Sequence, residues 1–323
     1  MPSPYFFPAI QSVFRSHITS KPCCGARRNT ASAFCILAAA VFLAASLPSF
    51  CSENLVPSGD FEEAELIKQW SPTKAAVQES EEKASGEHSL RFTVDRSDAI
   101  SPELIEVDPK KHYELRAFIK EPDIKKAIEY VSTRVFIALL PYDRNEQRIP
   151  PMAVWTLPNT ETTLARDAAP GDTVVYLAGE PWEAMPPSIG TGIAFDVKED
   201  RSDLPNFSAI GMDNNIQVKD GVAVVTLQSP LDQAWPAGTR VRRHRYADFP
   251  TSFMEPLPAW TEHSIEIGGV SDPDAVNMRE FWPGVKYVRV AIGVRPPADA
   301  SGKLPSDEQA VDVLVDDVSF TAQ

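Results

Sequence analysis

Beyond residue 51 the sequence contains no cysteine. All four cysteines, Cys23, Cys24, Cys35 and Cys51, lie in the first 51 residues. If that segment is removed, the chain has no thiols, so neither disulfides nor thiolate metal sites can stabilise it.

Familiar catalytic motifs are also missing. There is no Gly-x-Ser-x-Gly and no His-Glu-x-x-His, and the histidines after residue 51 are scattered without metal-ligand spacing. These absences argue against the hydrolase and metalloprotease classes that such motifs mark. A lyase that uses Tyr and Arg leaves no local motif, so it stays an alternative.

Basic residues are in the minority. Lys and Arg number 31 against 45 acids, which gives a formal net charge of −14, and loss of the leader's four basic residues would make it −18. Phosphates repel such a chain, so nucleic acid and anionic lipid are not expected partners. One basic stretch, "RVRRHR" at residues 240–245, is interpreted as a solvated strand edge. A site that grips a sulfated or uronic-acid glycan is the alternative.

The first 51 residues are predicted to be a signal peptide. An apolar run, "ASAFCILAAAVFLAASL", follows a basic lead without acids, and the small residues Ser49 and Cys51 favour cleavage just after Cys51. We therefore expect a secreted, cell-surface or periplasmic protein with no membrane contact after cleavage. An uncleaved anchor is the alternative, because the lead is long and the run is close to the length that spans a bilayer.

Period-two patterns dominate the rest of the chain. In residues 112–120 the apolar Tyr113, Leu115, Ala117 and Ile119 alternate with the polar Glu114, Arg116 and Lys120. Related patterns occur in "HSLRFTV", "TRVFIALL", "HSIEIGG" and "KYVRVAIGV". Helical patterns are limited to residues 122–131 and 272–281, capped by Asp123 and Asp272. Strands with one polar face and few helices predict an all-β fold of antiparallel sheets, a sandwich or a barrel.

The middle of the chain differs from its flanks. Two proline-rich stretches, "RIPPMAVWTLP" and "FPTSFMEPLPAW", bracket a segment with its own short strands, including a hairpin predicted at Asp220-Gly221. We predict an inserted β-rich domain at residues 158–247, within a sandwich formed by residues 52–157 and 248–323.

Several segments share their order and spacing with a known family. They are "NLVPSGDFEEAELIKQW", "HSLRFTV", "VDPKKHYELRAFIK", "AWTEHSIEI" and "VDVLVDDVSF". Over most of residues 54–140 and 250–321 the chain resembles carbohydrate-binding modules of the family 4/9 type. The resemblance implies a jelly-roll β-sandwich of the galactose-binding-like superfamily, with a polysaccharide or glycan as partner.

Two adjacent acids, Asp316 and Asp317, interrupt a valine-rich strand. With period two, one of them points inward, where a carboxylate must be paired, hydrogen-bonded, metal-bound or protonated. A bulge is the alternative, since it would bring the apolar residues on both sides of the pair onto one face. The family resemblance implies a structural calcium held by Glu62 and Asp316, with Asp60 and Asp317 as helpers. Backbone N–H bonds to Asp316 at a bulge, without an ion, are equally expected.

A sugar-binding face needs flat aromatic rings beside hydrogen-bonding side chains. Tyr142 and Arg144 follow a predicted strand, Trp155 lies close by in the sequence, and Trp282 is expected in a loop beside charged residues. We predict these four as ligand-binding residues; burial in a core is the alternative for each tryptophan.

Taken together, these features predict an exported, non-catalytic carbohydrate-binding protein. One alternative is a structural or adhesive surface protein that uses the sandwich for protein contacts. Another is an unrecognised polysaccharide lyase or hydrolase. Exposed aromatic residues in one groove would favour glycan binding, whereas buried ones would favour scaffolding.

Overall fold

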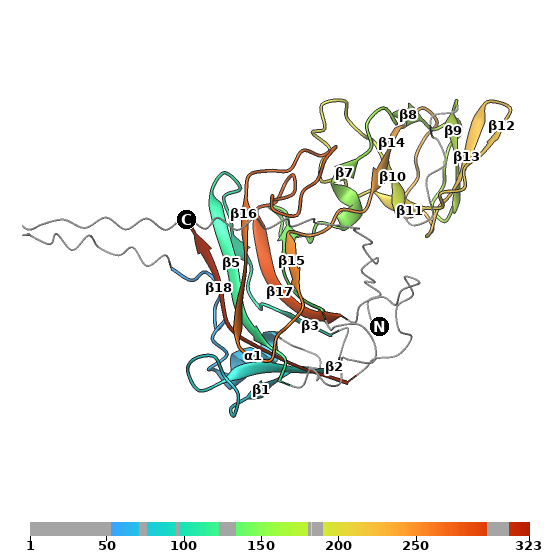
Figure 1. Ribbon diagram of the computed structural model, residues 1–323. Helices are drawn as coiled ribbons and strands as arrows, with labels where there is room; N and C mark the ends of the chain where they lie inside the picture. Colours follow the sequence, from blue (N-terminus) through green and yellow to red (C-terminus); the bar gives the residue numbers. More distant parts are fainter. Residues whose placement is uncertain are drawn as a thin grey trace, which may run out of the picture. The chain divides into compact units, whose positions relative to one another are not determined.

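Strands from both sides of the middle segment combine in two antiparallel sheets (Figure 1). The computed structural model describes residues 53–70, 76–94, 97–122, 134–179, 182, 190–295 and 310–323. The predicted leader and the helix predicted from Asp123 onward lie outside these ranges. Within them, no helix has the length and apolar character needed to cross a membrane.

The first sheet has the strand order β1-β2-β18-β5-β16. Its strands are β1 (Ala76–Glu79), β2 (Ser89–Val94), β18 (Ala310–Ala322), β5 (His112–Lys120) and β16 (Thr261–Gly268). All neighbours pair antiparallel. In β5 Tyr113, Leu115, Ala117 and Ile119 are buried and the residues between them, which include Phe118, are not, so the alternation predicted for this strand is confirmed.

The second sheet has the order β15-β6-β17-β3, with β4 beside β17. Its strands are β15 (Thr251–Met254), β6 (Arg134–Tyr142), β17 (Tyr287–Arg295), β3 (Ser97–Ile100) and β4 (Ile105–Glu106). From Pro141 back to Val135, β6 is buried on both of its faces. In β6, side chains that point away from the sandwich core are therefore buried as well as those that point into it.

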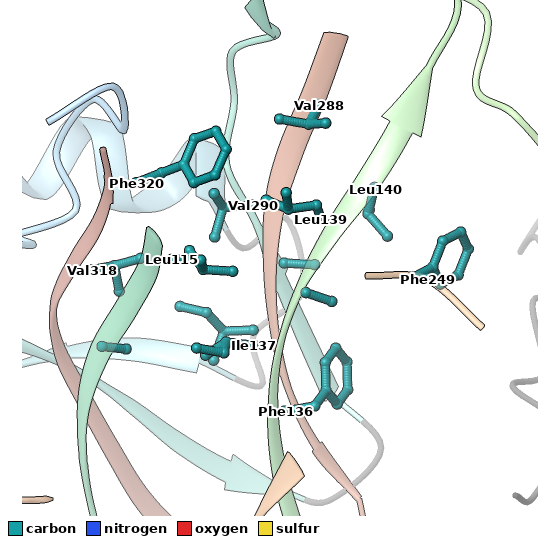
Figure 2. Close-up of a cluster of buried hydrophobic side chains, with 14 of the residues drawn as sticks. Leu115, Phe136, Ile137, Leu139, Leu140, Phe249, Val288, Val290, Val318 and Phe320 are labelled. Atoms are coloured by element: carbon teal, nitrogen blue, oxygen red, sulfur yellow. The ribbon is translucent and has the colours of Figure 1, made fainter. Parts of the chain in front are cut away.

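One hydrophobic cluster joins the two sheets into a sandwich. Leu115 and Phe320 from the first sheet belong to the same cluster as Ile137 and Val290 from the second (Figure 2). A short helix, α1 (Ala64–Trp70), adds the fully buried Trp70. The predicted all-β fold of antiparallel sheets is confirmed, and the jelly-roll connectivity stays a prediction.

A β-bulge explains the acid pair in β18. The pairing of β18 with β5 shifts register between Asp316 and Ser319, and Asp317 has a φ of 48°. The extra residue resets the period, so Val315 before the pair and Val318 after it both enter the core. The bulge alternative is thus confirmed.

The middle segment forms two further sheets. One has the order β11-β10-β14-β7 with β8 beside β14, and the other the order β12-β13-β9. The strands are β7 (Trp155–Thr156), β8 (Thr162–Thr163), β9 (Val174–Ala178), β10 (Thr191–Phe195), β11 (Ile210–Met212), β12 (Gln217–Lys219), β13 (Val222–Thr226) and β14 (Arg240–Arg245).

This segment has its own hydrophobic cluster, drawn from residues 164–241. Asp220 and Gly221, with φ of 52° and 71°, form the predicted two-residue turn between β12 and β13. Residues 52–323 together form one compact unit. The boundaries at 158 and 247 stay predictions.

The helix predicted at residues 272–281 is wrong, because the segment consists of turns. Asp272 does accept the N–H of Asp274 at 2.9 Å, as a helix cap would. Asn277 then accepts the N–H of Arg279 at 2.8 Å. Such side-chain bonds to nearby backbone groups compete with helical hydrogen bonds and favour turns.

Candidate functional site

Polar and aromatic side chains project from the outer side of the second sheet. Strand register places Arg289 of β17 opposite Leu140 of β6, and Tyr287 opposite Tyr142. Residues opposed in this way project from the same face. The valines on both sides of Arg289 are fully buried in the sandwich core, so Arg289 points outward. Figure 2 shows Leu140 on the side of β6 away from Leu115.

Arg289 lacks an acceptor for its Nε–H. Its guanidinium carbon lies 5.6 Å from the centre of the Tyr142 ring. The Nε atom is buried, and no described atom accepts a hydrogen bond from it. A buried donor without an acceptor costs about 1–3 kcal/mol. Arg289 as a whole is half-buried, and an acceptor that reaches its Nε–H would remove this cost.

A tight turn leads from Tyr142 to Arg148. The buried Asp143 organises it, because its carboxylate accepts two backbone N–H groups of the turn at 2.9 and 2.8 Å. Tyr142 and Arg148 are bridged across the turn. The guanidinium carbon of Arg148 lies 5.5 Å from the centre of the Phe249 ring. The turn therefore places a second arginine over an aromatic ring.

Trp282 lies behind this surface. It is fully buried and stacks on Phe249, with ring centroids 5.0 Å apart at 22°. Its Nε1–H is donated to the backbone oxygen of Asp248 at 3.2 Å. Trp282 has no free face for a sugar, so the packing role given above as its alternative fits its position. Arg144 is exposed in the turn after Tyr142 and makes no aromatic or ionic contact with a described residue.

Trp155 meets a third arginine. The guanidinium carbon of Arg245 lies 3.9 Å from the centre of the indole ring, and its buried Nε also has no acceptor among the described residues. Trp155 itself is half-buried and donates Nε1–H to the backbone oxygen of Asp274 at 3.4 Å. Burial lowers the pKa of Arg245. Burial also raises the pKa of Asp248, and the positive charge of Arg245 opposes that rise.

These contacts join three of the four predicted ligand residues into one continuous group. Its order is Tyr142, Arg148, Phe249, Trp282, Asp248, Arg245 and Trp155. We call Tyr142, Arg148, Trp155, Arg245, Phe249 and Arg289 the arginine–aromatic cluster. Sequence reasoning included Arg245 only within the basic stretch 240–245, as the alternative acidic-glycan site, and missed Arg148, Phe249 and Arg289. Arg289 left a signal there as the polar residue between valines in "KYVRVAIGV".

The surroundings of the cluster are rich in arginine. Arg148 interacts electrostatically with Asp98, which forms an ion pair with Arg295 at 2.6 Å. Burial raises the pKa of Asp98, and Arg295 opposes the rise. Glu106, opposite Tyr287, is paired with Lys286. Two of the local carboxylates are therefore already paired with basic residues, in a chain whose net charge is −14.

The basic stretch 240–245 is not a solvated strand edge, as the sequence had suggested. It forms β14, which lies inside its sheet between β10 and β7, and Arg242 and His244 are fully buried. Arg242 is paired with Asp203 at 2.8 Å and donates Nε–H to Nε2 of His244 at 3.2 Å. This pairing within the fold makes the burial of charge possible.

His244 is held neutral by its neighbours. Because Nε2 accepts from Arg242, the proton must be on Nδ1, which lies 2.8 Å from the backbone oxygen of Met152. Burial, together with the charge of Arg242, lowers the pKa of His244 to about 4. The imidazole is therefore a structural element of the strand at neutral pH.

Asp316, predicted as a calcium ligand, is surrounded by N–H donors. Its Oδ2 accepts the backbone N–H groups of Ala84 at 2.8 Å and Ser85 at 3.1 Å, and its Oδ1 accepts that of Asp317 at 2.8 Å. Burial raises the pKa of Asp316, and these hydrogen bonds oppose the rise. The side chain of Asp317 accepts a hydrogen bond from the Ser85 hydroxyl at 2.9 Å.

Glu62 is occupied in the same way. Its Oε1 accepts the N–H groups of Glu87 at 2.7 Å and His88 at 3.1 Å, and the first of these is the main reason that its pKa is lowered. Asp60 accepts the N–H of Glu62 at 3.4 Å. Calcium needs six to eight oxygen ligands. Here the oxygens of Asp316 and Glu62 already accept backbone N–H groups, whose hydrogens occupy the positions next to these oxygens. The described residues contain no group of three acids, histidines or cysteines that could hold a metal. In this arrangement the four acids do not fit a calcium site.

No protein-family model matches the chain, and no curated protein matches it. The resemblance to carbohydrate-binding modules therefore stays a prediction.

Proposed function

We propose that this protein is a non-catalytic carbohydrate-binding protein that holds a polysaccharide or glycan at the arginine–aromatic cluster. The observation that carries the proposal concerns Arg245 and Arg289, which each lie over an aromatic ring and each keep a buried Nε without an acceptor. Sugar sites combine rings with side chains that hydrogen-bond hydroxyl groups. A ligand with several oxygens supplies the acceptors that these arginines lack.

The family resemblance supports the proposal independently of the cluster. Four of its five quoted segments form β2, β5, β16 and β18 of the first sheet, and the other contains α1. A jelly-roll connectivity is part of what we propose. The leader supports export to the cell surface, the periplasm or the medium. The intact mass of the protein made in a secretory host tests this, because cleavage after Cys51 removes residues 1–51, whereas an anchor retains them.

A glycan-array screen of the purified protein tests the binding function. We expect selective binding that falls at least about tenfold in Trp155→Ala, since aromatic anchors often contribute 2 kcal/mol or more. Trp235→Ala is the matched control, because Trp235 is a half-buried tryptophan of the middle segment outside the cluster. Melting temperatures establish that both variants are folded.

Other outcomes identify the alternatives. If no glycan is bound, the proposal fails and a structural or adhesive surface protein takes its place. If incubation with polysaccharides releases new reducing ends or unsaturated uronates, the protein is an enzyme.

A further inference from the structure

The guanidinium groups of the cluster present hydrogen-bond donors, and their stacking limits what can reach the rings. Arg245 lies only 3.9 Å from the centre of the Trp155 ring, so it covers one face of the indole. Arg289 covers Tyr142 in a looser way, at 5.6 Å. A ligand at these positions therefore meets N–H edges first. A planar fork of N–H groups matches a carboxylate or sulfate, which offers two or more acceptors at once.

Hydrogen bonds to a charged acceptor are stronger than those to a neutral one, which favours an anionic ligand at these arginines. Hydrogen bonds to charged groups contribute about 1.5–3 kcal/mol, against about 1 kcal/mol for neutral partners. Arg116 and Arg243 also have a buried Nε that lacks an acceptor, but Arg116 has an ion pair and Arg243 donates from Nη2 to Asn214 at 3.3 Å. For Arg245 and Arg289 no acid lies within ion-pair distance among the described residues.

The net negative charge of the chain does not cancel this local preference. At physiological salt, charges further apart than about 8 Å are largely screened, so the nearest groups dominate. Carboxylates near the cluster include Asp98 and Glu106, which are paired, Asp143, which accepts two backbone N–H groups, and Asp248. The Asp248 carboxylate accepts no hydrogen bond from a described residue, so it can accept one from a sugar hydroxyl.

We infer that the ligand is an acidic glycan, whose uronate or sulfate groups are bound by Arg245 and Arg289 while its hydroxyl groups face Asp248. This inference rests on the proposed function and names the class of glycan. Arginine forks, an unpaired acid and nearby rings suit a ligand with both anionic groups and hydroxyls. A simple polyanion would use the arginines alone.

Paired polysaccharides test the inference by changing charge on a constant backbone. Binding of the purified protein to polygalacturonate is compared with its fully methyl-esterified form, and binding to heparin with desulfated heparin. We expect polygalacturonate to bind at least about tenfold more tightly than its neutral ester, or heparin at least about tenfold more tightly than desulfated heparin, which keeps its carboxylates. Tenfold is the equivalent of one charge-assisted hydrogen bond. A difference within the polygalacturonate pair indicates uronate recognition, and a difference within the heparin pair indicates sulfate recognition. Single-stranded poly-dT serves as a polyanion without a glycan.

Variants then assign the binding to the cluster. We expect Arg289→Ala to weaken binding to the acidic glycan about tenfold, and Arg289→Lys to recover little, because lysine keeps the charge but not the planar fork. Arg116→Ala is the matched control, since the Nε of Arg116 is also buried without an acceptor but its guanidinium is paired with Glu262 on the other sheet.

Each contrary result has a distinct meaning. Equal binding of the two members within both polysaccharide pairs overturns the acidic class and leaves glycan binding standing, as does an array on which only neutral glycans bind. Equal losses in Arg289→Ala and Arg116→Ala, or comparable binding of poly-dT, overturn specific recognition by the cluster. Absence of binding to every glycan overturns the proposed function as well.

Discussion

Arg242 donates its Nε–H to Nε2 of His244 at 3.2 Å, inside the strand where both side chains are buried. A protonated imidazole would have to give up this bond and would place a second positive charge beside the guanidinium. The pair therefore makes the fold sensitive to acid through a buried imidazole.

The free energy of unfolding should fall between pH 6.5 and 4 because of His244. Its folded pKa of about 4 is below its ordinary value of 6.5, so on acidification the unfolded chain takes up the proton first. Stability from this group is complete above pH 6.5 and is lost toward pH 4, with a total of about 3 kcal/mol.

Urea unfolding across this pH range measures the effect. The comparison is with His244→Asn, which keeps an N–H donor for Met152 but does not titrate. The variant should be less stable at pH 7 and should show a flatter pH dependence. An equally steep slope in both proteins would assign the acid sensitivity to other groups.

Replacing Asp316 should destabilise the sandwich strongly. Asp316→Ala leaves three backbone N–H groups without their acceptor, and each buried unsatisfied donor costs about 1–3 kcal/mol. We expect a loss of at least about 3 kcal/mol in the free energy of unfolding. Asp317→Gly is the control, because the φ of 48° at this residue suits glycine. Similar losses in both variants would contradict the role given to Asp316.

Calcium should leave the melting temperature unchanged. The carboxylates of Asp316 and Glu62 already accept N–H groups, so binding would require the loop at residues 84–88 to withdraw. A site loaded at 100 times its Kd would add about 2.7 kcal/mol, which corresponds to a rise of roughly 5 °C or more. Melting in excess calcium and in chelator measures this. A higher melting temperature in calcium than in chelator would support the metal site that the family resemblance implies.

Gly59→Ala should destabilise the protein through a backbone clash. A Cβ at residue 59 would lie 2.0 Å from the backbone oxygen of Val318, whose N–H is bonded to the Gly59 oxygen at 2.8 Å. Forced overpacking costs about 1–3 kcal/mol, and we expect the upper part of that range. Gly171→Ala provides the comparison, because a Cβ there meets no atom within 4 Å and only its positive φ is strained. Chemical denaturation should rank Gly59→Ala as the more harmful change.

The strands were predictable because alternation is a local property. In β5 each apolar residue of the pattern is buried, and the turn at Asp220-Gly221 follows from residues that tolerate positive φ. The bulge at Asp316 was also foreseen as an alternative, since an acid pair inside a valine-rich strand leaves few solutions.

The candidate site was less accessible to sequence reasoning. Tyr142 and Trp155 were chosen for their ring chemistry, but Arg245 and Phe249 join them only through contacts between segments far apart in the sequence. The burial of Arg242 depends on Asp203, 39 residues away, so a run of basic residues was mistaken for a surface feature. The fold determines which distant residues become partners, so a local sequence pattern does not predict them.

The position of β18 has a consequence for how the protein is made. β18 is the middle strand of its sheet, between β2 and β5, yet it follows all the other strands along the chain. A ribosome therefore produces both halves of the sheet before the strand that joins them. Until then β2 and β5 each expose an unpaired edge, which is a template for aggregation. The nascent chain should thus depend on chaperones, or on rapid completion of synthesis, to protect these edges until the last strand arrives.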